Sequence, residues 1–347
     1  MNRLTELLGI EHPIVLGPFG GVSSVALTAA VSDSGGLGSY GLYGYDANRI
    51  AATAAELRAA TGRPFALNLW LPTGDEVTPD VVDLAEARAA VAPLFADLGL
   101  EPPPTPAAFL PPFAEQAEAV LDARPGVLSL VFGVPPRELV EQAHARGIVV
   151  VGTATTVEEA VALETGGVDA VVATGLEAGG HRVSFLRPAE QSLVGSLALV
   201  PQVADAVGVP VIAAGGIVDR RGVAAALALG ADGVQVGTAF LATRQSAAPP
   251  SHRAAITTAA GTPTVLTRAM SGRLARGIPN RALRTIEESG AIAPFPAQNW
   301  LTGRFRAEAA TRDRGELLSL WAGQGAPLVR LAEASGVFAE LRAGLPD

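Results

Sequence analysis

Cysteine and lysine are both absent from this chain of 347 residues. Without cysteine there can be no disulfide, iron–sulfur cluster, thiolate zinc site or cysteine nucleophile. Without lysine there can be no Schiff-base chemistry, which excludes lysine aldolases and pyridoxal phosphate enzymes, and no Walker phosphate loop. Several classes of enzyme are excluded by these two absences alone.

Long apolar runs are missing as well. The apolar stretches, such as residues 127–132, are far shorter than the roughly 20 residues that cross a bilayer. The N-terminal MNRLTELLGIEHP has acidic residues close behind its single Arg and no apolar core, so it does not resemble a secretory signal. The net charge of −9, with scattered arginines, would repel nucleic acid. We therefore expect a cytoplasmic protein with neither membrane nor nucleic acid as a partner.

Short β-branched runs alternate with alanine-rich stretches, and 49% of the residues are apolar. This pattern is typical of βα units around a parallel sheet that is buried on both faces. We count about eight units, which predicts an α/β fold of the (β/α)8 or TIM-barrel type. Strands are expected near residues 14–16, 37–40, 65–69, 127–132, 149–152, 170–173, 211–214 and 234–236. Helices are expected at residues 24–34, 46–61, 81–98, 114–123, 136–146 and 157–165, with Ser24 and Asp46 as N-caps.

The regular alternation is interrupted twice. Residues 73–124 contain the proline-rich EPPPTP and LPPF stretches and predict an elaborated connection between strands. After Thr243 the pattern gives way to QSAAPPSH, a helical stretch, an Arg-rich loop at 267–280 and PFPAQNW. We expect a barrel at 1–245, a smaller cap or substrate domain over the barrel mouth at 246–310, and C-terminal helices at 311–347 that return to the barrel.

The string GLGSYG at residues 36–41 matches the dinucleotide-binding pattern G-x-G-x-x-G. That pattern requires a strand before it and a helix opening from it. Here a predicted helix comes first, so the order is reversed. We predict a tight turn and a closely packed strand instead.

Glycines end the last two predicted barrel strands, in AAGGI at 213–217 and in VGTAF at 236–240. In many barrels these two strand ends bind phosphate through bare backbone N–H groups, assisted by helix dipoles. Glycine is also simply permissive where a strand turns into a loop. The paired positions in consecutive units favour a phosphate site, and such a site needs no lysine.

The sequence EAGGHR follows the sixth predicted strand and brings His181 to the same end of the barrel. Imidazole can accept or donate a proton near neutral pH, so His181 is the candidate catalytic residue. His12, in an entry turn, His144, on a helix near the opposite end, and His252, in a proline-rich loop, are expected to be solvated or structural. We expect no metal site, because no second histidine lies near His181 at ligand spacing.

These motifs together resemble the nitronate monooxygenases, formerly called 2-nitropropane dioxygenases, a family of FMN-dependent barrel oxidoreductases. FMN-dependent enoyl-acyl-carrier-protein reductases and NADH:quinone reductases are related to it. The resemblance runs nearly from end to end. It rests on PIVLGPFGGVSS, AAVSDSGGLGSYG, NLW, EAGGHR, AAGGI, VQVGTAF, SGRLARGIPN, PAQNW and WAGQG.

The resemblance implies that FMN lies across the barrel mouth and that His181 is the catalytic histidine. It also implies a set of cofactor contacts, of which the glycines after strands seven and eight, with Thr238, would hold the phosphate. These contacts are Gly17, Pro18, Phe19, Asn68, Thr174, Gly179, Gly180, Gly215, Gly216, Gly237 and Thr238. The family often has Gln in place of Thr174, which shortens or removes one polar contact to the flavin. HRVSF also replaces the commoner His-Arg-Gly continuation.

The activity implied by the resemblance is the oxidation of alkyl nitronates, and of nitroalkanes if they are accepted, by O2 to carbonyl compounds and nitrite. His181 would stabilise the anion or deprotonate a nitroalkane. Arg273, Arg276 and Gln298 are candidates for the substrate rim, with solvent-facing arginines as the alternative. A homodimer is left open.

Two other functions are compatible with the same residues. The flavin could take hydride from NAD(P)H and pass it to a quinone or an enoyl thioester. The chain could instead be a non-redox phosphate-binding barrel such as an isomerase. Chemistry of the IMP-dehydrogenase type is excluded, because it requires cysteine.

Overall fold

A computed structural model describes residues 2–259 and 264–346. Eight parallel strands form one sheet in the order β1, β9, β8, β6, β5, β4, β3, β2. A further parallel bridge between Val15 and Leu37 joins the two ends of this order, so the sheet is a nearly closed barrel. The strands are β1 (Ile14–Leu16), β2 (Gly38–Gly41), β3 (Phe65–Trp70), β4 (Val127–Val131), β5 (Val149–Ala154), β6 (Ala170–Thr174), β8 (Val211–Ala214) and β9 (Gly233–Val236).

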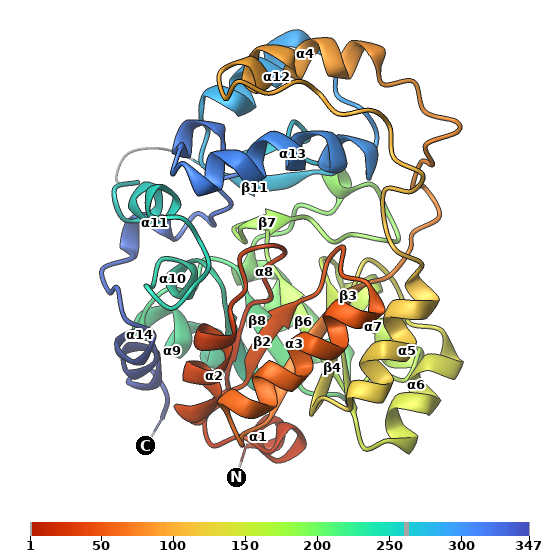
Figure 1. Cartoon of the computed structure of the whole chain (residues 1–347). Coiled ribbons are helices and arrows are strands. Elements are labelled where there is room, and N and C mark those ends of the chain that lie inside the picture. Colours follow the sequence, from red (N-terminus) through yellow and green to blue (C-terminus); the bar gives the residue numbers. More distant parts are fainter. Residues whose placement is uncertain (1, 260–263, 347) are drawn as a thin grey trace.

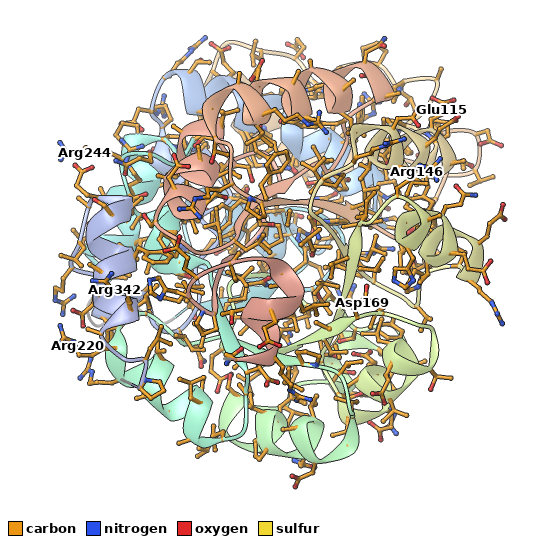
Figure 2. The ribbon with its side chains drawn as sticks, turned by 90° about the horizontal axis from the view of Figure 1, so that it is seen from below. Glu115, Arg146, Asp169, Arg220, Arg244 and Arg342 are labelled. Carbon is orange, nitrogen blue, oxygen red and sulfur yellow. The ribbon has the colours of Figure 1, made fainter. Side chains whose placement is uncertain are left out.

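Helices surround the strands, as expected for a (β/α)8 barrel, and the predicted fold is confirmed (Figure 1). Figure 2, a view from below, shows them as a ring, with the last helix at its edge near Arg220 and Arg342. The helices of the ring are α2 (Val25–Asp33), α3 (Ala47–Ala60), α5 (Phe113–Ala123), α6 (Arg137–Ala145), α7 (Val157–Thr165), α8 (Ser196–Ala206), α9 (Arg220–Ala228), α10 (Thr238–Leu241) and α14 (Ala334–Arg342).

The two predicted N-caps are present. The Ser24 hydroxyl accepts the N–H of Leu27 at 3.0 Å, and the Asp46 carboxylate accepts the N–H of Arg49 at 2.8 Å. Each bond satisfies an N–H that the first helical turn cannot pair by itself. Both helices therefore begin where the sequence predicts.

Two apolar cores stabilise the barrel. One lies between the strands and the surrounding helices, and the other fills the interior of the barrel. The inner core includes Leu4 and Leu8 of the short helix α1 (Arg3–Leu8), which closes the lower end of the barrel. Side chains alternate in direction along each strand, so successive inward residues form layers. The lower layers of the barrel interior are apolar.

The glycines of residues 36–41 are required by close packing. A Cβ atom on Gly38 would lie 2.1 Å from the carbonyl oxygen of Thr28, and one on Gly41 would lie 2.7 Å from that of Phe19. Helix α2 precedes this segment, and β2 runs through it. The prediction of a closely packed strand in place of a dinucleotide-binding turn is confirmed.

A layer of helices and a small sheet covers the upper end of the barrel (Figure 1). It contains α4 (Ala85–Ala96), α11 (Pro250–Thr257), β10 (Val265–Thr267), β11 (Ala275–Gly277), α12 (Arg281–Ser289) and α13 (Ala297–Thr311). Helix α4, from the connection between β3 and β4, packs on α12 and α13. The cap therefore draws on two parts of the chain that are far apart in the sequence.

The predicted Arg-rich loop at 267–280 contains a strand. Strand β11 pairs antiparallel with β10 on one side and with β7 (Gly180–His181) on the other. The predicted division at 245 and 310 stays a prediction, and residues 260–263 of the expected cap lie outside the described part of the chain.

In place of the C-terminal helices expected at 311–347, the described residues after Thr311 contain one α-helix, α14. Short 3-10 turns η2 (Gly315–Leu317) and η3 (Ala326–Leu328) precede α14, which packs against α2 and α9. An ion pair between Arg220 and Glu340, at 2.6 Å, joins α9 to α14. Within the described residues, no helix has both the length and the apolar character needed to cross a membrane.

A buried carboxylate holds together two loops near the upper end of the barrel. Glu159, fully buried on α7, accepts hydrogen bonds from the N–H and hydroxyl of Thr155, each at 2.7 Å. Its other oxygen accepts the N–H groups of Phe185 at 2.6 Å and Leu186 at 3.2 Å. These bonds fix the segment that follows His181.

Glu159→Gln is expected to lower the free energy of unfolding by about 1–3 kcal/mol. The amide NH2 of Gln would replace a carboxylate oxygen and face backbone N–H groups, which would then lose their acceptor. Urea denaturation measures the change. Glu158→Gln is the matched control, because the neighbouring Glu158 is exposed and forms an ion pair with exposed Arg187. It should change stability by less than about 0.5 kcal/mol. Equal effects of the two variants would contradict the role given to Glu159.

Candidate active site

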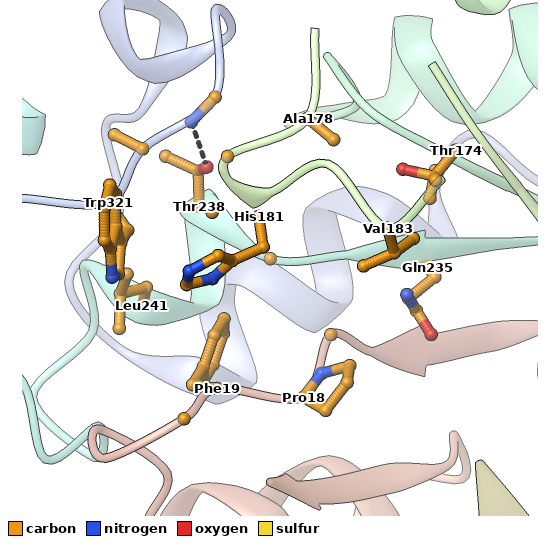
Figure 3. Close-up of a pocket in the computed structure, with 18 of the residues that line it drawn as sticks. Pro18, Phe19, Thr174, Ala178, His181, Val183, Gln235, Thr238, Leu241 and Trp321 are labelled. Atoms are coloured by element: carbon orange, nitrogen blue, oxygen red, sulfur yellow. Dashed lines mark hydrogen bonds between the residues drawn. The ribbon is translucent and has the colours of Figure 1, made fainter. Parts of the chain in front are cut away.

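A cavity of about 360 Å³ lies at the C-terminal ends of the barrel strands, beneath the cap. His181 and all eleven residues predicted as cofactor contacts line it. In Figure 3, Thr174 and Gln235 lie on one side of His181 and Trp321 on the other, with Pro18 and Phe19 on a facing wall. The sequence motifs, far apart along the chain, thus meet around one space of the size typical of ligand sites.

The floor of the cavity is a polar layer of the barrel interior. Apolar inward residues, such as Val151 and Val172, are followed two positions later by Thr153 and Thr174. The same alternation places Asn68 two residues above Ala66, and its amide donates to the carbonyl of Ser129 at 3.1 Å. Amide and hydroxyl groups therefore replace the apolar core where the strands end.

Glycine-rich backbone forms another wall of the cavity. A Cβ atom on Gly179 would lie 2.5 Å from the amide nitrogen of Gly323, and one on Gly325 would lie 2.9 Å from the carbonyl oxygen of Gly216. The N–H of Gly323 donates to the Thr238 hydroxyl at 2.9 Å, the bond drawn in Figure 3. Because these backbone segments pack closely without side chains, their main-chain groups are exposed to the cavity.

This wall suits a phosphate through its N–H groups more than through helix dipoles. In residues 2–259 and 264–346, the N–H groups of Gly216 and Gly237 have no hydrogen-bond acceptor. The start of α9 is already capped by the Asp219 carboxylate, and α10 is only four residues long. The expected contribution of helix dipoles is therefore small.

Ser23 fixes the loop after β1. Its hydroxyl donates to the carbonyl of Phe19 at 2.8 Å and accepts the N–H of Gly41 at 3.0 Å. A Cβ atom on Gly17 would lie 3.2 Å from the Cα atom of Gly237, so the two ends of the barrel sheet meet here without side chains. The ring of Phe19 and the backbone around Pro18 consequently face the cavity.

The position of His181 depends on the pairing of β7 with β11. In that register Ala275 lies opposite His181, and the adjoining Ser271 hydroxyl lies 2.8 Å from His181 Nε2. The next side chain, Arg182, is buried and donates to the carbonyls of Gly175 at 2.7 Å and Thr174 at 3.0 Å. Because side chains alternate in direction along β7, His181 faces the cavity and Arg182 binds the end of β6.

Aromatic rings enclose the imidazole of His181. The ring of Trp70 lies 4.9 Å from it, edge to face, and that of Trp321 lies 5.4 Å away. Burial, and then the positive charges of Arg273 and Arg306, lower the pKa of His181 to about 3. The imidazole is therefore neutral at physiological pH.

The hydrogen bonds of Ser271 indicate which nitrogen of His181 is available. Ser271 donates to the carbonyl of Arg273 at 3.1 Å, so its oxygen receives the Nε2–H of the histidine. Nδ1 has no partner among the described residues and is left as the proton acceptor. A neutral acceptor in an aromatic enclosure can take or share a proton with a bound ligand.

The three residues predicted for the substrate rim lie apart from this cavity, and all three are buried. Arg273 faces a second cavity of about 170 Å³, where it pairs with Asp75 at 2.6 Å and Glu76 at 2.8 Å. Arg276 donates to the carbonyl of Leu176 at 2.9 Å. Gln298 donates to the carbonyl of Ala269 at 2.7 Å. Their hydrogen bonds are made within the protein, and their role toward substrate stays a prediction.

The other histidines lie outside the cavity. His144, on α6, pairs with Asp169 at 2.9 Å, and His12 contacts the ring of Phe338 in the turn before β1. His252 is not in a loop, as the prolines suggested, but on α11, where its Nε2 lies 3.0 Å from the carbonyl of Trp321. Burial lowers the pKa of His252 to about 4, so this histidine is a neutral structural residue.

Several lining residues were not predicted. Thr153 and Gln235 could have been found, because each is a polar residue at the end of a predicted apolar strand. Gly323 and Gly325 belong to the WAGQG motif, but no local pattern relates that motif to the strand ends. Asn299 and Arg306 of α13, with Tyr43 and Trp70, complete the upper wall.

Comparisons with known proteins show similarity along nearly the whole chain. The sequence profile of the family described as nitronate monooxygenase matches residues 1–342. A protein described as a probable nitronate monooxygenase from Staphylococcus aureus (strain Newman) is 39% identical over 342 residues, which is 98% of this chain and 96% of that relative.

Solved structures give the same result. Nitroalkane oxidase from Streptomyces ansochromogenes is 37% identical, with a TM-score of 0.86 and coverage of 98% of this chain and 97% of that one. FabK from Thermotoga maritima is 29% identical, with a TM-score of 0.76 and coverage of 98% and 94%. The chain therefore belongs to the nitronate monooxygenase family, and with it to the flavin-dependent oxidoreductases.

Proposed function

We propose that the protein binds FMN in the glycine-walled cavity and oxidises alkyl nitronates with O2, giving carbonyl compounds and nitrite. The observation that carries the proposal is His181, a neutral imidazole that faces the cavity from a strand fixed by the cap. The similarity to nitroalkane oxidase supports the same class of substrate.

The cavity fits FMN at both ends of that molecule. Bare N–H groups at Gly216 and Gly237, with the hydroxyl of Thr238, would hold the phosphate. The polar floor, with Asn68 and Gln235, would meet the hydrogen-bonding edge of the ring system, and Thr174 adds a hydroxyl where the family often has a longer amide. When bound, the flavin supplies the electron acceptor for the nitronate and returns the electrons to O2.

The residues of this chain orient and shield the substrate. Trp70 and Trp321 flank His181 and exclude water from that side of the cavity. Nδ1 of His181 can share a proton with an oxygen of the nitronate or accept one from the α-carbon of a nitroalkane. Because its pKa is lowered to about 3, His181 is a weak base. The site therefore favours a preformed anion over a neutral acid that must first be deprotonated.

The reductase function remains the second candidate, supported by the 29% identity with FabK along nearly the whole chain. In that function, a flavin held by the same residues would accept hydride from NAD(P)H. Anaerobic mixing of the purified protein with NADH separates the two functions. Rapid bleaching of the flavin would favour the reductase, and no bleaching would favour nitronate oxidation.

Purified protein is expected to be yellow and to show the absorbance bands of oxidised flavin. Release by heat and mass spectrometry should identify FMN, because the cavity offers one cradle for one phosphate. A folded protein that neither carries nor takes up flavin would contradict the proposal. It would favour the non-redox phosphate-binding barrel.

Gly237→Val is expected to raise the Kd for FMN at least about tenfold, which corresponds to ~1.4 kcal/mol. A Cβ atom at Gly237 has ordinary van der Waals space, 3.6 Å from Phe19, so its methyl groups would project toward the ligand. Gly216 is a poorer test, because its φ of +75° strains any side chain. FMN titration of the apoprotein measures the effect.

The control for this substitution is Gly62→Val. Gly62 is exposed, and a Cβ atom there would meet nothing within 4 Å. Both variants are compared by thermal unfolding in the apo form. A stable Gly237→Val protein with unchanged FMN affinity would refute the phosphate assignment.

His181→Asn is expected to lower nitroalkane turnover by about 10²- to 10⁴-fold and nitronate turnover by less, with FMN content unchanged. The reason is that a nitroalkane must lose a proton, whereas a nitronate needs only a hydrogen bond. Oxygen consumption with each substrate measures both rates. His144→Asn, at the opposite end of the barrel, serves as the control. Unchanged rates with both substrates would return His181 to a structural role.

The pH dependence follows from the same pKa. Imidazole protonation in the free wild-type enzyme lies near pH 3, so kcat/KM for a preformed nitronate should show no inflection near 6.5, the ordinary value for histidine. A histidine inflection near 6.5 that disappears in His181→Asn would show that His181 is not desolvated as described.

A further inference from the structure

Arg306, on the cap helix α13, lines the cavity, and its hydrogen-bond partners among the described residues are all neutral. Nε donates to the Thr302 hydroxyl at 3.2 Å, and Nη1 donates to the Ser319 hydroxyl at 2.8 Å. Nη2 donates to the carbonyl and the side-chain oxygen of Asn299, at 3.2 and 2.7 Å. These bonds leave one N–H of Nη1 without an assigned acceptor.

The charge of Arg306 has no counter-ion. Across residues 2–259 and 264–346, no carboxylate lies within the 4.0 Å that defines an ion pair with its guanidinium. Burial lowers the pKa of Arg306 to about 10, so the group is still charged at neutral pH. Arg273, by contrast, is neutralised by Asp75 and Glu76. An enclosed charge without a partner is costly, and a bound anion would offset that cost.

The surroundings of Arg306 also suit an anion. Its positive charge lowers the pKa of His181, and it acts on Tyr43 as well, so it lies within electrostatic range of both. The Tyr43 oxygen accepts from the Asn299 amide at 2.9 Å, which leaves its own hydroxyl hydrogen free. Burial raises the pKa of Tyr43 to about 12, so this hydrogen is retained. The upper wall therefore offers a cation and a neutral donor. Glu76 acts on Tyr43 but pairs with Arg273, and no Asp or Glu is among the described residues that line the cavity.

We propose that Arg306 is the anion-recognition residue of the substrate site. Its guanidinium binds the negatively charged oxygens of a small planar oxyanion held near His181, and it makes the enzyme select the anionic form of a substrate over the neutral form. This inference rests on the proposed function for the identity of that anion as a nitronate. The binding preference itself does not require turnover.

The test uses the purified flavin-containing protein and two probes, propionate and propionamide. Both are small and planar at the functional group, but only propionate shares with a nitronate a negative charge spread over two oxygens. Isothermal titration calorimetry should show that the wild type binds propionate more tightly than propionamide. Arg306→Met should weaken propionate about 10- to 100-fold, as expected for the loss of a charge-assisted hydrogen bond. Propionamide binding should be unchanged.

A second variant leaves Arg306 in place. Asn299→Asp has nearly the same shape and puts a carboxylate where an amide oxygen now lies 2.7 Å from Nη2. This internal counter-ion should abolish the preference for propionate without removing any packing of Arg306. The matched control is Arg304→Met, because Arg304 lies on the same helix but is exposed and outside the cavity.

Three results would overturn the proposal. One is propionate binding that is absent in the wild type or unchanged in Arg306→Met and Asn299→Asp. Another is an equal loss in Arg304→Met, which would indicate a general charge effect. The third is an Arg306→Met protein that loses FMN but still binds propionate as the wild type does. That result would show that the guanidinium binds the cofactor. Intact propionate selectivity without nitronate oxidation would refute the proposed function and leave Arg306 as an anion site.

Discussion

The two-residue alternation of the barrel strands is the constraint on which the site depends. Inward side chains form stacked layers, and a closed barrel must fill each layer from its own strands. Here α1 closes the lower end over apolar residues, whereas Thr153, Thr174 and Asn68 form the uppermost layer. That layer cannot be packed by apolar atoms of the same barrel. The cap covers this polar layer from above, and the cavity lies between the layer and the cap.

The electrostatics of this space differ from those of the whole chain. The protein carries a net charge of −9, yet the charged groups that add to burial in lowering the pKa of His181 are the guanidiniums of Arg273 and Arg306. The acidic residues lie at the surface or are engaged elsewhere, as Glu159 is with backbone N–H groups. A negatively charged protein thus encloses a cavity that is lined by the positive charge of Arg306. In such a place a single charge acts over a longer range than it does in water.

Local sequence patterns predicted the barrel strands, the caps at Ser24 and Asp46, the glycines at the strand ends and the place of His181, whereas the family resemblance supplied the other residues that meet at the cavity. They succeeded because period-two burial, capping and strand-end glycines are properties of adjacent residues. The pairing of β7 with β11 and the joining of α4 to the cap depend on contacts between distant segments. Arg273 was expected at the substrate rim because it lies in the predicted cap, and nothing in the sequence around it indicated its ion pairs with Asp75 and Glu76, about two hundred residues earlier. No local rule contains that information.

The strand pairing between Gly180–His181 and Ala275–Arg276 has a mechanical consequence. In enzymes with a hinged lid, the covering element swings away while the catalytic groups stay on the scaffold. Here the cap and His181 share one ladder of backbone hydrogen bonds, so lifting the cap would break the strand pairing that orients the imidazole. Substrate and product must then enter and leave through an opening at the edge of a cap that stays in place. Differences in substrate range among relatives should accordingly arise from the width of that opening.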